Sequence, residues 1–471
     1  MFNQKMNSTF RWQLLATMVI AIIQIITLVL LGRILGFKDL GSFAILQVTF
    51  RFALAAFEPG MFFSIVQQHE SSPKLIQKLT TTQFKLTILS ILILGSIFLY
   101  SQELNAWHLA VIACLILLTI SVGSKYNNLL ILFEKQKEIS IIQIFSYSIE
   151  LVFILITIFK YNPLYFFSIG ILIRQFVYYL LCHLVHLKFT KMEMVIAETK
   201  YKTNHITPSL QNMASQILSF IQGQYDTLLI FLLFGLPILG PYNLASEFSF
   251  LIFSKINPVF SKAIFPSLSK AKKHLVQVDE IILSSLVSYL YFIIPIYFFI
   301  WVHAEYILNL AYQSKGKDIL VFVRYFLIIA LIKAINNILT TYLLSIGASR
   351  WVLYWNVTLL GLNYLLCAIF FYSSIDIITF FKFSIFYALI FTLIGITYLL
   401  RKIEWTKVSL LDTLYQIFSF LLIINLIIYI NSLVFSDFII NSIMVVASFF
   451  IVLFLTNRNK FTQLINFKIS E

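Results

Sequence analysis

Long apolar runs, each bounded by polar or turn-forming residues, follow one another along almost the whole chain. A helix needs about 20 mainly apolar residues to cross the hydrocarbon core of a bilayer. The runs have about this length, so the pattern predicts about fourteen transmembrane helices in an all-α polytopic membrane protein. The predicted spans cover residues 11–34, 41–66, 79–100, 106–132, 139–159, 163–187, 209–234, 239–262, 281–302, 319–345, 351–372, 377–400, 412–432 and 438–456.

The composition agrees with this pattern. Of the 471 residues, 60% are hydrophobic and only 11% are charged, whereas about 25% of a soluble domain is charged. A water-soluble enzyme is therefore excluded. The three cysteines lie far apart in apolar stretches and suggest neither a zinc site nor a disulfide framework. The segment Cys182-His183-x-x-His186 ends a predicted span with no further ligand nearby, so we predict no metal site.

The net charge of +14 is interpreted first as a signal of membrane topology. Cytoplasmic loops carry an excess of lysine and arginine. If the N-terminus is cytoplasmic, the basic residues outside the spans fall almost entirely in the tails and in the even-numbered connections. The outer connections hold only Lys38, Lys160, Lys315 and Lys317. We therefore predict that both termini are cytoplasmic, and nucleic acid is no longer needed to explain the charge.

The connections between spans are too short for a soluble catalytic domain. The longest polar one, about 188–208, is far below domain size, and the largest outer one is about 303–318. The chain has no phosphate-binding loop and no Asp-x-Asp pair, so we predict that it is not an enzyme and needs no cofactor. A membrane glycosyltransferase or polymerase, which usually needs a large outer loop, is a less favoured alternative.

One segment of the chain recurs in its second half in the same register. Two glycine turns are each followed by an aromatic residue and then by a mid-helix proline, which predicts two structurally equivalent halves. Such parallel repeats place a substrate site between the halves and allow alternating access by rocking. The copies read Leu35-Gly36-x-x-x-Leu40-Gly41-x-Phe43 with Pro59, and Phe234-Gly235-x-x-x-Leu239-Gly240-x-Tyr242 with Pro258.

The repeat and the connections together predict four parts. Residues 1–188 form an N-terminal six-helix lobe, 189–208 a cytoplasmic linker, and 209–400 a C-terminal six-helix lobe. Residues 401–471 contain two additional transmembrane helices without a repeat partner, and a tail.

Several short motifs resemble the polysaccharide transporter (Wzx-type flippase) family, which shares a superfamily with multidrug exporters and lipid II flippases. They include Arg33-x-Leu35-Gly36, Tyr225-Asp226 and Phe265-Pro266-x-Leu268-Ser269. The resemblance implies a V-shaped bundle of two pseudo-symmetric six-helix lobes in the bacterial inner membrane. Such a protein moves an undecaprenyl-pyrophosphate-linked oligosaccharide from the cytoplasmic to the outer leaflet. The sugar repeat stays open, as does the product: O-antigen of lipopolysaccharide, capsule or exopolysaccharide.

The same resemblance implies the partners of the chain. They are the lipid-linked glycan and membrane lipid, together with a polysaccharide polymerase and a chain-length regulator, and the protein itself is expected to be a monomer. An exporter of drugs or other small molecules on the same fold is the main alternative. An exporter of cationic drugs would have an acidic cavity.

Charged residues inside the predicted spans need an explanation, because a charge at the bilayer centre costs roughly 2.5–3.5 kcal/mol on insertion scales. The cations outnumber the anions, which favours a water-filled cavity for an anionic ligand such as a lipid pyrophosphate and counts against a cationic drug. The acids are Glu58, Glu150, Asp226 and Glu247, and the bases are Arg51, Lys85, Lys125, Arg174, Lys255, Lys262, Arg324, Lys333 and Lys382.

Arg51 and Lys255 are the first candidates for binding the phosphates. Arg51 lies about 15 Å from the outer end of its span, too deep to reach the interface easily. Lys255 lies at a similar depth in the repeat-equivalent helix, and lipid II flippases use a basic residue in each of these two helices. Arg174 and Lys333 are further candidates. Salt bridges with neighbouring acids are the alternative for these residues.

Glu58 and Asp226 are candidates for coupling transport to an ion. Glu58 precedes Pro59, whose ring frees a backbone carbonyl. A carboxylate beside freed carbonyls can bind H⁺ or Na⁺. Asp226 follows Tyr225 in the family-like motif of the seventh span. Structural pairing of either acid with a lysine or arginine is the alternative.

Overall fold

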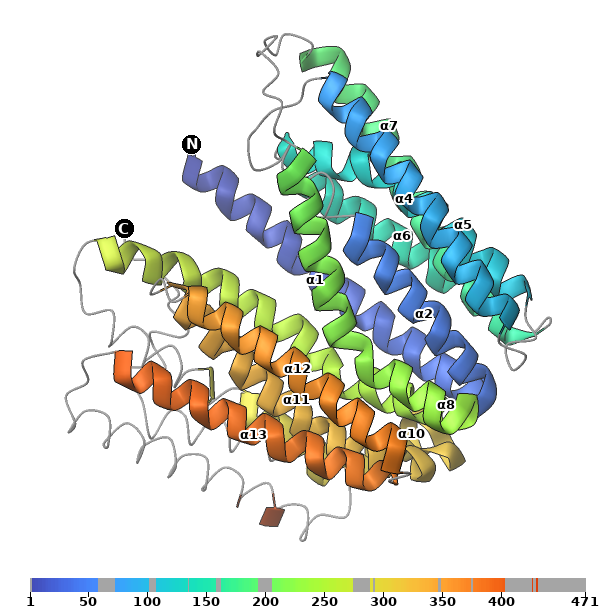
Figure 1. Cartoon of the computed structure of the whole chain (residues 1–471). Helices are drawn as coiled ribbons and strands as arrows, with labels where there is room; N and C mark the ends of the chain where they lie inside the picture. The colour runs from blue at the N-terminus through green and yellow to red at the C-terminus, as the bar shows by residue number, and fades with distance from the viewer. Residues whose placement is uncertain are drawn as a thin grey trace. The chain divides into compact units, whose positions relative to one another are not determined.

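The structure is a computed structural model, and the part of the chain that it describes is almost entirely helical (Figure 1). No strand occurs among the described residues, so the predicted all-α fold is confirmed. The described residues are 2–57, 73–100, 107–133, 135–157, 162–193, 206–273, 289–290, 293–345, 349–373, 376–402, 426 and 429–430.

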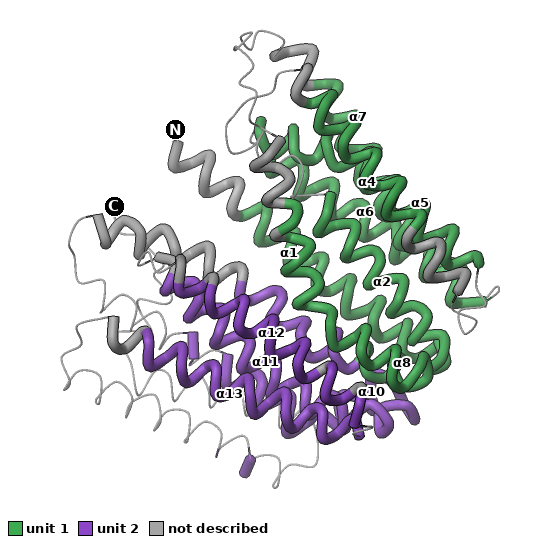
Figure 2. The backbone as a smooth tube through the Cα atoms, in the orientation of Figure 1, with its two compact units in different colours: residues 1–244 green, residues 245–471 purple. Residues whose placement is uncertain are grey.

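The chain divides into two compact units, Met1–Leu244 and Ala245–Glu471 (Figure 2). Unit 1 contains α1 (Phe2–Ile34), α2 (Phe37–Phe57), α4 (Pro73–Tyr100), α5 (Trp107–Leu132), α6 (Gln136–Thr157), α7 (Pro163–Glu193) and the first part of α8 (Ile206–Lys273). Unit 2 contains the rest of α8, then α10 (Ala304–Tyr312), η2 (Gln313–Lys315), α11 (Gly316–Ser345), α12 (Ser349–Ser373) and α13 (Ile377–Lys402). The four predicted parts and their V-shaped arrangement stay predictions.

Seven helical segments in the described part of the chain are long and apolar enough to cross a membrane. Six of them carry exposed leucines or isoleucines, which suit a hydrocarbon environment, whereas Phe37–Phe57 carries none. The segments are Arg11–Ile34, Phe37–Phe57, Trp107–Leu132, Gln136–Thr157, Pro163–Lys188, Gln216–Asn257 and Ile377–Tyr398. The predicted spans 412–432 and 438–456 lie outside the described residues except at 426, 429 and 430, so the number fourteen stays a prediction.

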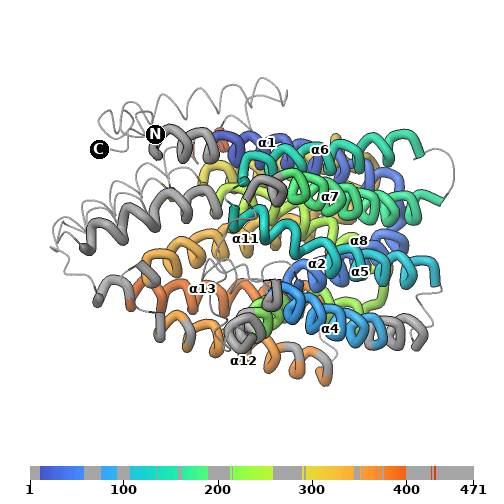
Figure 3. The backbone as a smooth tube through the Cα atoms, turned by 90° about the horizontal axis from the view of Figure 1, so that it is seen from above, coloured from blue at the N-terminus to red at the C-terminus, as the bar shows by residue number. Residues whose placement is uncertain are grey.

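The helices of unit 1 pack through both apolar and polar contacts. α7 packs against α5 and α6, and α1 lies beside α6 (Figures 1 and 3). Between α4 and α5, Gln83 donates a hydrogen bond of 2.8 Å to Ser124, and Thr87 donates one of 2.6 Å to Ser121. Buried hydroxyls and amides need such partners because lipid offers none.

The two copies of the repeat contact each other within unit 1 in a reciprocal way. A Cβ atom on Gly41 would lie 2.2 Å from the carbonyl oxygen of Leu236, and one on Gly240 would lie 2.1 Å from that of Phe37. Phe37 and Leu236 are themselves equivalent, because each follows the first glycine of its copy. Both copies therefore carry glycine at this position, Gly41 and Gly240, because a larger residue would collide with the backbone of the other copy.

The first glycine of each copy interrupts the helix, as predicted. Gly36 lies between α1 and α2. Gly235 has φ 71° and ψ −174° inside α8, so that α8 consists of two helical parts that meet there. A positive φ is readily adopted only by glycine. The predicted spans 209–234 and 239–262 are these two parts.

The predicted outer connection 303–318 is helical rather than irregular, because it contains α10 and η2. Leu308 and Tyr312 lie on one face of α10 and are buried. α10 packs against α11. The short apolar face explains why this connection folds as a helix although it is too short to cross a membrane.

Candidate functional site

Two of the sequence-predicted site residues come together in unit 1. Arg51 lies on α2 and is half-buried, and Asp226 lies on the first part of α8. The carboxylate of Asp226 is close enough to act electrostatically on the Arg51 guanidinium. The structure therefore joins a predicted phosphate-binding cation to a predicted ion-coupling acid.

Hydrogen bonds hold the carboxylate of Asp226 in place. The hydroxyl of Tyr242 donates to Oδ2 at 2.9 Å, and the backbone N–H of Thr227 donates to Oδ1 at 2.8 Å. Tyr242 is the aromatic residue of the second repeat copy, at the position of Phe43 in the first. The sequence alone did not identify Tyr242 as a site residue. The signal that marks it is the extra hydroxyl relative to its repeat equivalent.

A further polar contact lies next to this group on α2. Gln47 is four residues before Arg51, which places both on one face of the helix. The side-chain amide of Asn243 donates a hydrogen bond of 3.1 Å to the carbonyl oxygen of the Gln47 side chain. We call the set Gln47, Arg51, Asp226, Tyr242 and Asn243 the α2–α8 polar cluster.

Arg174 on α7 has a partner of its own. Its Nη1 lies 2.7 Å from Oε2 of Glu150 on α6, and both side chains are buried. The guanidinium also lies 5.2 Å from the ring centre of Phe50 and 4.5 Å from that of Tyr147. Its Nε is buried without a hydrogen-bond partner. Arg174 is therefore held as an ion pair between two aromatic rings, which is the structural alternative to phosphate binding.

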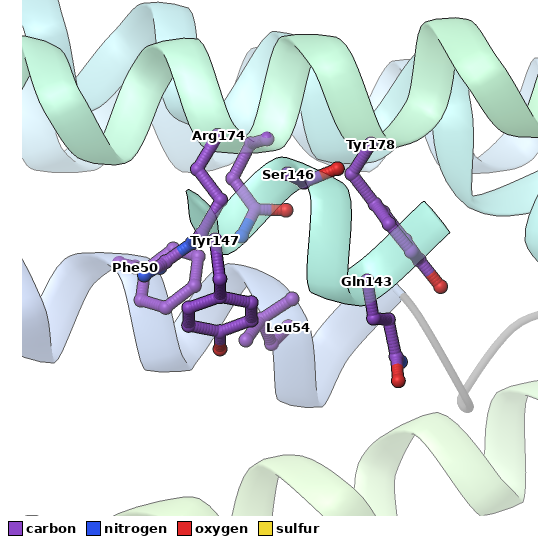
Figure 4. Close-up of a pocket in the computed structure, with 8 residues that line it drawn as sticks. Phe50, Leu54, Gln143, Ser146, Tyr147, Arg174 and Tyr178 are labelled. Atoms are coloured by element: carbon purple, nitrogen blue, oxygen red, sulfur yellow. The ribbon is translucent and has the colours of Figure 1, made fainter. Parts of the chain in front are cut away.

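The same arginine lines a pocket of about 460 Å³ between α2, α6 and α7 (Figure 4). This volume counts space that is open to the surroundings, so it is larger than the enclosed hollow itself. In Figure 4 the polar ends of Gln143, Tyr147 and Tyr178 point to the same side. The pocket residues are Phe50, Leu54, Gln143, Ser146, Tyr147, Arg174, Gln175 and Tyr178.

The remaining predicted residues belong to unit 2 or lie outside the described residues. In unit 2, Lys255 on α8 is half-buried and has no ion-pair partner among the described residues. Lys333 on α11 is exposed, and its Nζ lies 4.7 Å from the ring centre of Phe250. Glu58 lies outside the described residues. Within the described part of the chain, no three His, Cys, Asp or Glu side chains are grouped so that they could hold a metal ion.

Two solved structures have the same fold as this chain. A lipid II flippase MurJ in an inward closed conformation superposes with a TM-score of 0.66 at 15% identity, covering 95% of this chain and 99% of that one. An inward-facing multidrug resistance MATE family transporter of the MOP superfamily gives a TM-score of 0.62 at 13% identity, covering 82% and 96%. At these identities the likeness establishes the fold alone.

The sequence establishes the family. The chain belongs to the polysaccharide biosynthesis protein family, whose profile matches residues 30–321, and the predicted family resemblance is confirmed. The teichuronic acid biosynthesis protein TuaB of Bacillus subtilis (strain 168) is 22% identical over 279 residues, which are 57% of this chain and 56% of TuaB. The match thus spans little more than half the length of this relative.

Proposed function

We propose that the chain flips an undecaprenyl-pyrophosphate-linked oligosaccharide from the cytoplasmic to the outer leaflet of the bacterial inner membrane. It works by alternating access and supplies the biosynthesis of a surface polysaccharide. One observation carries the proposal: a member of the polysaccharide biosynthesis family has the fold of a lipid II flippase along 95% of its length. TuaB, named for teichuronic acid biosynthesis, supports a surface glycan as the cargo.

The charges of the described spans fit an anionic head group. Arginine holds phosphate oxygens with two parallel hydrogen bonds, and lysine adds a compact mobile charge. Arg51 and Lys255 supply these groups in the two repeat-equivalent helices. Asp226 beside Arg51 supplies a carboxylate whose protonation or Na⁺ binding would change the charge that the phosphates meet. On this proposal, Arg51 binds phosphate in one state and pairs with Asp226 in the other.

The direct test is transport by the purified full-length chain in vesicles. We expect a fluorescent undecaprenyl-pyrophosphate glycan in the inner leaflet to become accessible to an external quencher only when the protein is present. Several glycan lipids should be tried, each with an H⁺ gradient and with a Na⁺ gradient. If no glycan lipid moves between the leaflets under any of these conditions, the proposal is wrong.

A multidrug exporter is the second candidate, because the MATE family transporter shares the fold. The two candidates differ in the charge of their ligands. A deletion strain that loses surface glycan but keeps its drug resistance favours the flippase, and the reverse result favours the exporter. Polymerisation of glycan by the purified chain would instead support the membrane glycosyltransferase or polymerase alternative.

Replacing either candidate phosphate ligand is expected to impair transport. We predict that Arg51→Ala and Lys255→Ala each lower the initial rate of glycan flipping by about tenfold or more, because a charge-assisted bond to phosphate is lost. Lys85→Ala, which removes an exposed lysine on α4, is the matched control. All three proteins should reach the membrane in equal amounts. Wild-type rates in both site variants would refute the assignment.

Removing the charge of Asp226 is expected to uncouple transport from the driving ion. Asp226→Asn keeps an oxygen that accepts the hydrogen bond of Tyr242 but cannot bind a proton or Na⁺ in the same way. We expect the wild-type rate in vesicles to respond to an H⁺ or Na⁺ gradient and the variant rate to respond to neither. Tyr242→Phe, which restores the residue type of the first repeat copy, should keep the response. If Asp226→Asn responds to the gradient as strongly as the wild type does, Asp226 is not the residue that couples transport to the ion.

A further inference from the structure

The pocket of unit 1 contains many hydrogen-bonding groups but little net charge. Among the described residues that line it, Arg174 alone is charged, and its ion pair with Glu150 offsets that charge. A phosphate would have to compete with this carboxylate at 2.7 Å, and it would then leave Glu150 as a second anion beside it. The pocket is therefore poorly suited to the head-group phosphates.

The frame of the pocket is fixed by contacts with other helices. The hydroxyl of Tyr147 accepts a hydrogen bond of 3.4 Å from Gln24 of α1. The hydroxyl of Tyr178 donates one of 3.0 Å to Asn127 of α5. These two bonds hold the rings of Tyr147 and Tyr178, and the ion pair with Glu150 holds the guanidinium of Arg174. The pocket therefore keeps its shape without a ligand. Preorganised walls lower the entropic cost of binding.

Two lining amides, in contrast, are left for a ligand. Gln143 on α6 and Gln175 on α7 make no hydrogen bond to any other residue in the described part of the chain. Each amide offers two donors and one acceptor with two lone pairs. Neither amide is among the buried polar atoms that lack a partner, so water or a polar ligand can reach both, whereas a polyprenyl tail would offer them no hydrogen bond.

Aromatic and apolar surfaces complete the lining. The rings of Phe50 and Tyr147 flank Arg174, and Leu54 lies on the same helix as Phe50. A sugar ring has hydroxyls that both donate and accept hydrogen bonds, and it has C–H faces that pack on aromatic rings. The lining thus combines amides, hydroxyls and ring faces, and the charge of Arg174 is neutralised by Glu150. Such a lining matches a sugar more closely than it matches a phosphate, a cationic drug or a lipid tail.

We infer that the pocket of Gln143, Tyr147, Gln175 and Tyr178 is a subsite for an uncharged sugar residue of the transported glycan. The inference rests on the proposed function, because it names the part of the lipid-linked glycan that this pocket holds. Arg174 acts here as a positioning residue that holds the rings, and not as a phosphate ligand. The α2–α8 polar cluster and the sugar subsite then recognise different parts of one substrate.

Binding of free sugars to the full-length protein in detergent tests the inference without any transport step. Saturation-transfer NMR should be recorded with methyl glycosides of a neutral hexose, an N-acetylhexosamine and a uronic acid. We expect transfer to at least one of the two uncharged sugars. Gln143→Ala and Gln175→Ala should weaken its binding about tenfold each, because a buried hydrogen bond is lost. Gln77→Ala, which removes an exposed glutamine on α4, should leave binding unchanged.

Several outcomes would overturn the subsite. They are no transfer to either uncharged sugar, transfer that both pocket variants retain in full, and displacement of the sugar by inorganic pyrophosphate. Variants are compared only if their thermal unfolding midpoints match that of the wild type. Ser146→Ala provides a milder second probe, because it removes only a hydroxyl that is bonded within its own helix.

Transport by the same proteins separates the two levels of the proposal. If wild-type vesicles move no glycan lipid, the proposed function fails, whatever the sugar binding. If wild type and both pocket variants transport equally well and bind sugar equally well, the subsite fails while the proposed function stands. We expect wild type to transport and the pocket variants to transport about tenfold more slowly at low substrate concentration.

Discussion

Gly41→Ala and Gly240→Ala are each expected to destabilise the protein and to stop glycan transport. The added Cβ would lie within 2.2 Å of a backbone carbonyl oxygen in either case, so a helix would have to move. Overpacking of this kind costs about 1–3 kcal/mol, and more where backbone must give way. Elsewhere in a helix the same substitution stabilises by about 1 kcal/mol. The sign of the change in thermal unfolding midpoint therefore tests the contact.

The matched control is Gly36→Ala, five positions earlier in the same motif, where nothing lies within 4 Å of the added Cβ. It should leave the unfolding midpoint and transport close to the wild type. Because the two glycine contacts are equivalent, Gly41→Ala and Gly240→Ala should also have similar effects. A wild-type midpoint in either variant would mean that the repeat copies do not approach each other as described.

Glu150→Leu is expected to be the most destabilising single change in the α6–α7 contact. It leaves the buried charge of Arg174 without its partner, and breaking a buried ion pair from one side costs about 3–5 kcal/mol. Thermal unfolding in detergent, followed by loss of monodisperse protein, measures the effect. Glu305→Leu, which removes an exposed acid on α10, serves as the control and should shift the midpoint little.

The double variant Glu150→Leu/Arg174→Met distinguishes a structural pair from a ligand-binding cation. Replacement of both charges by apolar groups of similar size is often neutral or stabilising. We therefore expect the double variant to recover most of the stability that Glu150→Leu loses. If Arg174 instead contacts the phosphates, Arg174→Met alone stops pyrophosphate from binding, whereas a purely structural pair leaves that binding unchanged.

The transmembrane helices could be predicted from the sequence because the bilayer imposes both length and composition on them. The predicted spans 106–132 and 163–187 lie within a residue of the start of α5 and α7. α10 was not predicted, since a nine-residue helix in a connection has no membrane-length apolar run. The sequence signal for α10 is the four-residue spacing of Leu308 and Tyr312. This spacing indicates a buried helix face only once it is known that α10 packs against α11.

The site was predicted in part. A charge inside a span stands out in an apolar sequence, which is why Arg51, Asp226 and Arg174 were identified. Their pairing could not be read from the sequence, because it depends on which helices are neighbours. Gln143 and Gln175 were missed because a single amide in a span costs less than a charge and attracts less attention. The spacing of Gln143 and Tyr147, four residues apart on one helix face, is the signal that could have found Gln143.

The reciprocal glycine contact also bears on the origin of the chain. Gly41 of the first copy meets Leu236 of the second, and Gly240 of the second meets Phe37 of the first. Because these positions are equivalent in the repeat, the contact surface is self-complementary. Self-complementary patches are what close a two-fold homodimer. An ancestor of half the length could therefore have assembled as such a homodimer, held by this crossing before duplication and fusion. The two copies now differ at Phe43 and Tyr242, and only the second copy carries the hydroxyl that holds Asp226.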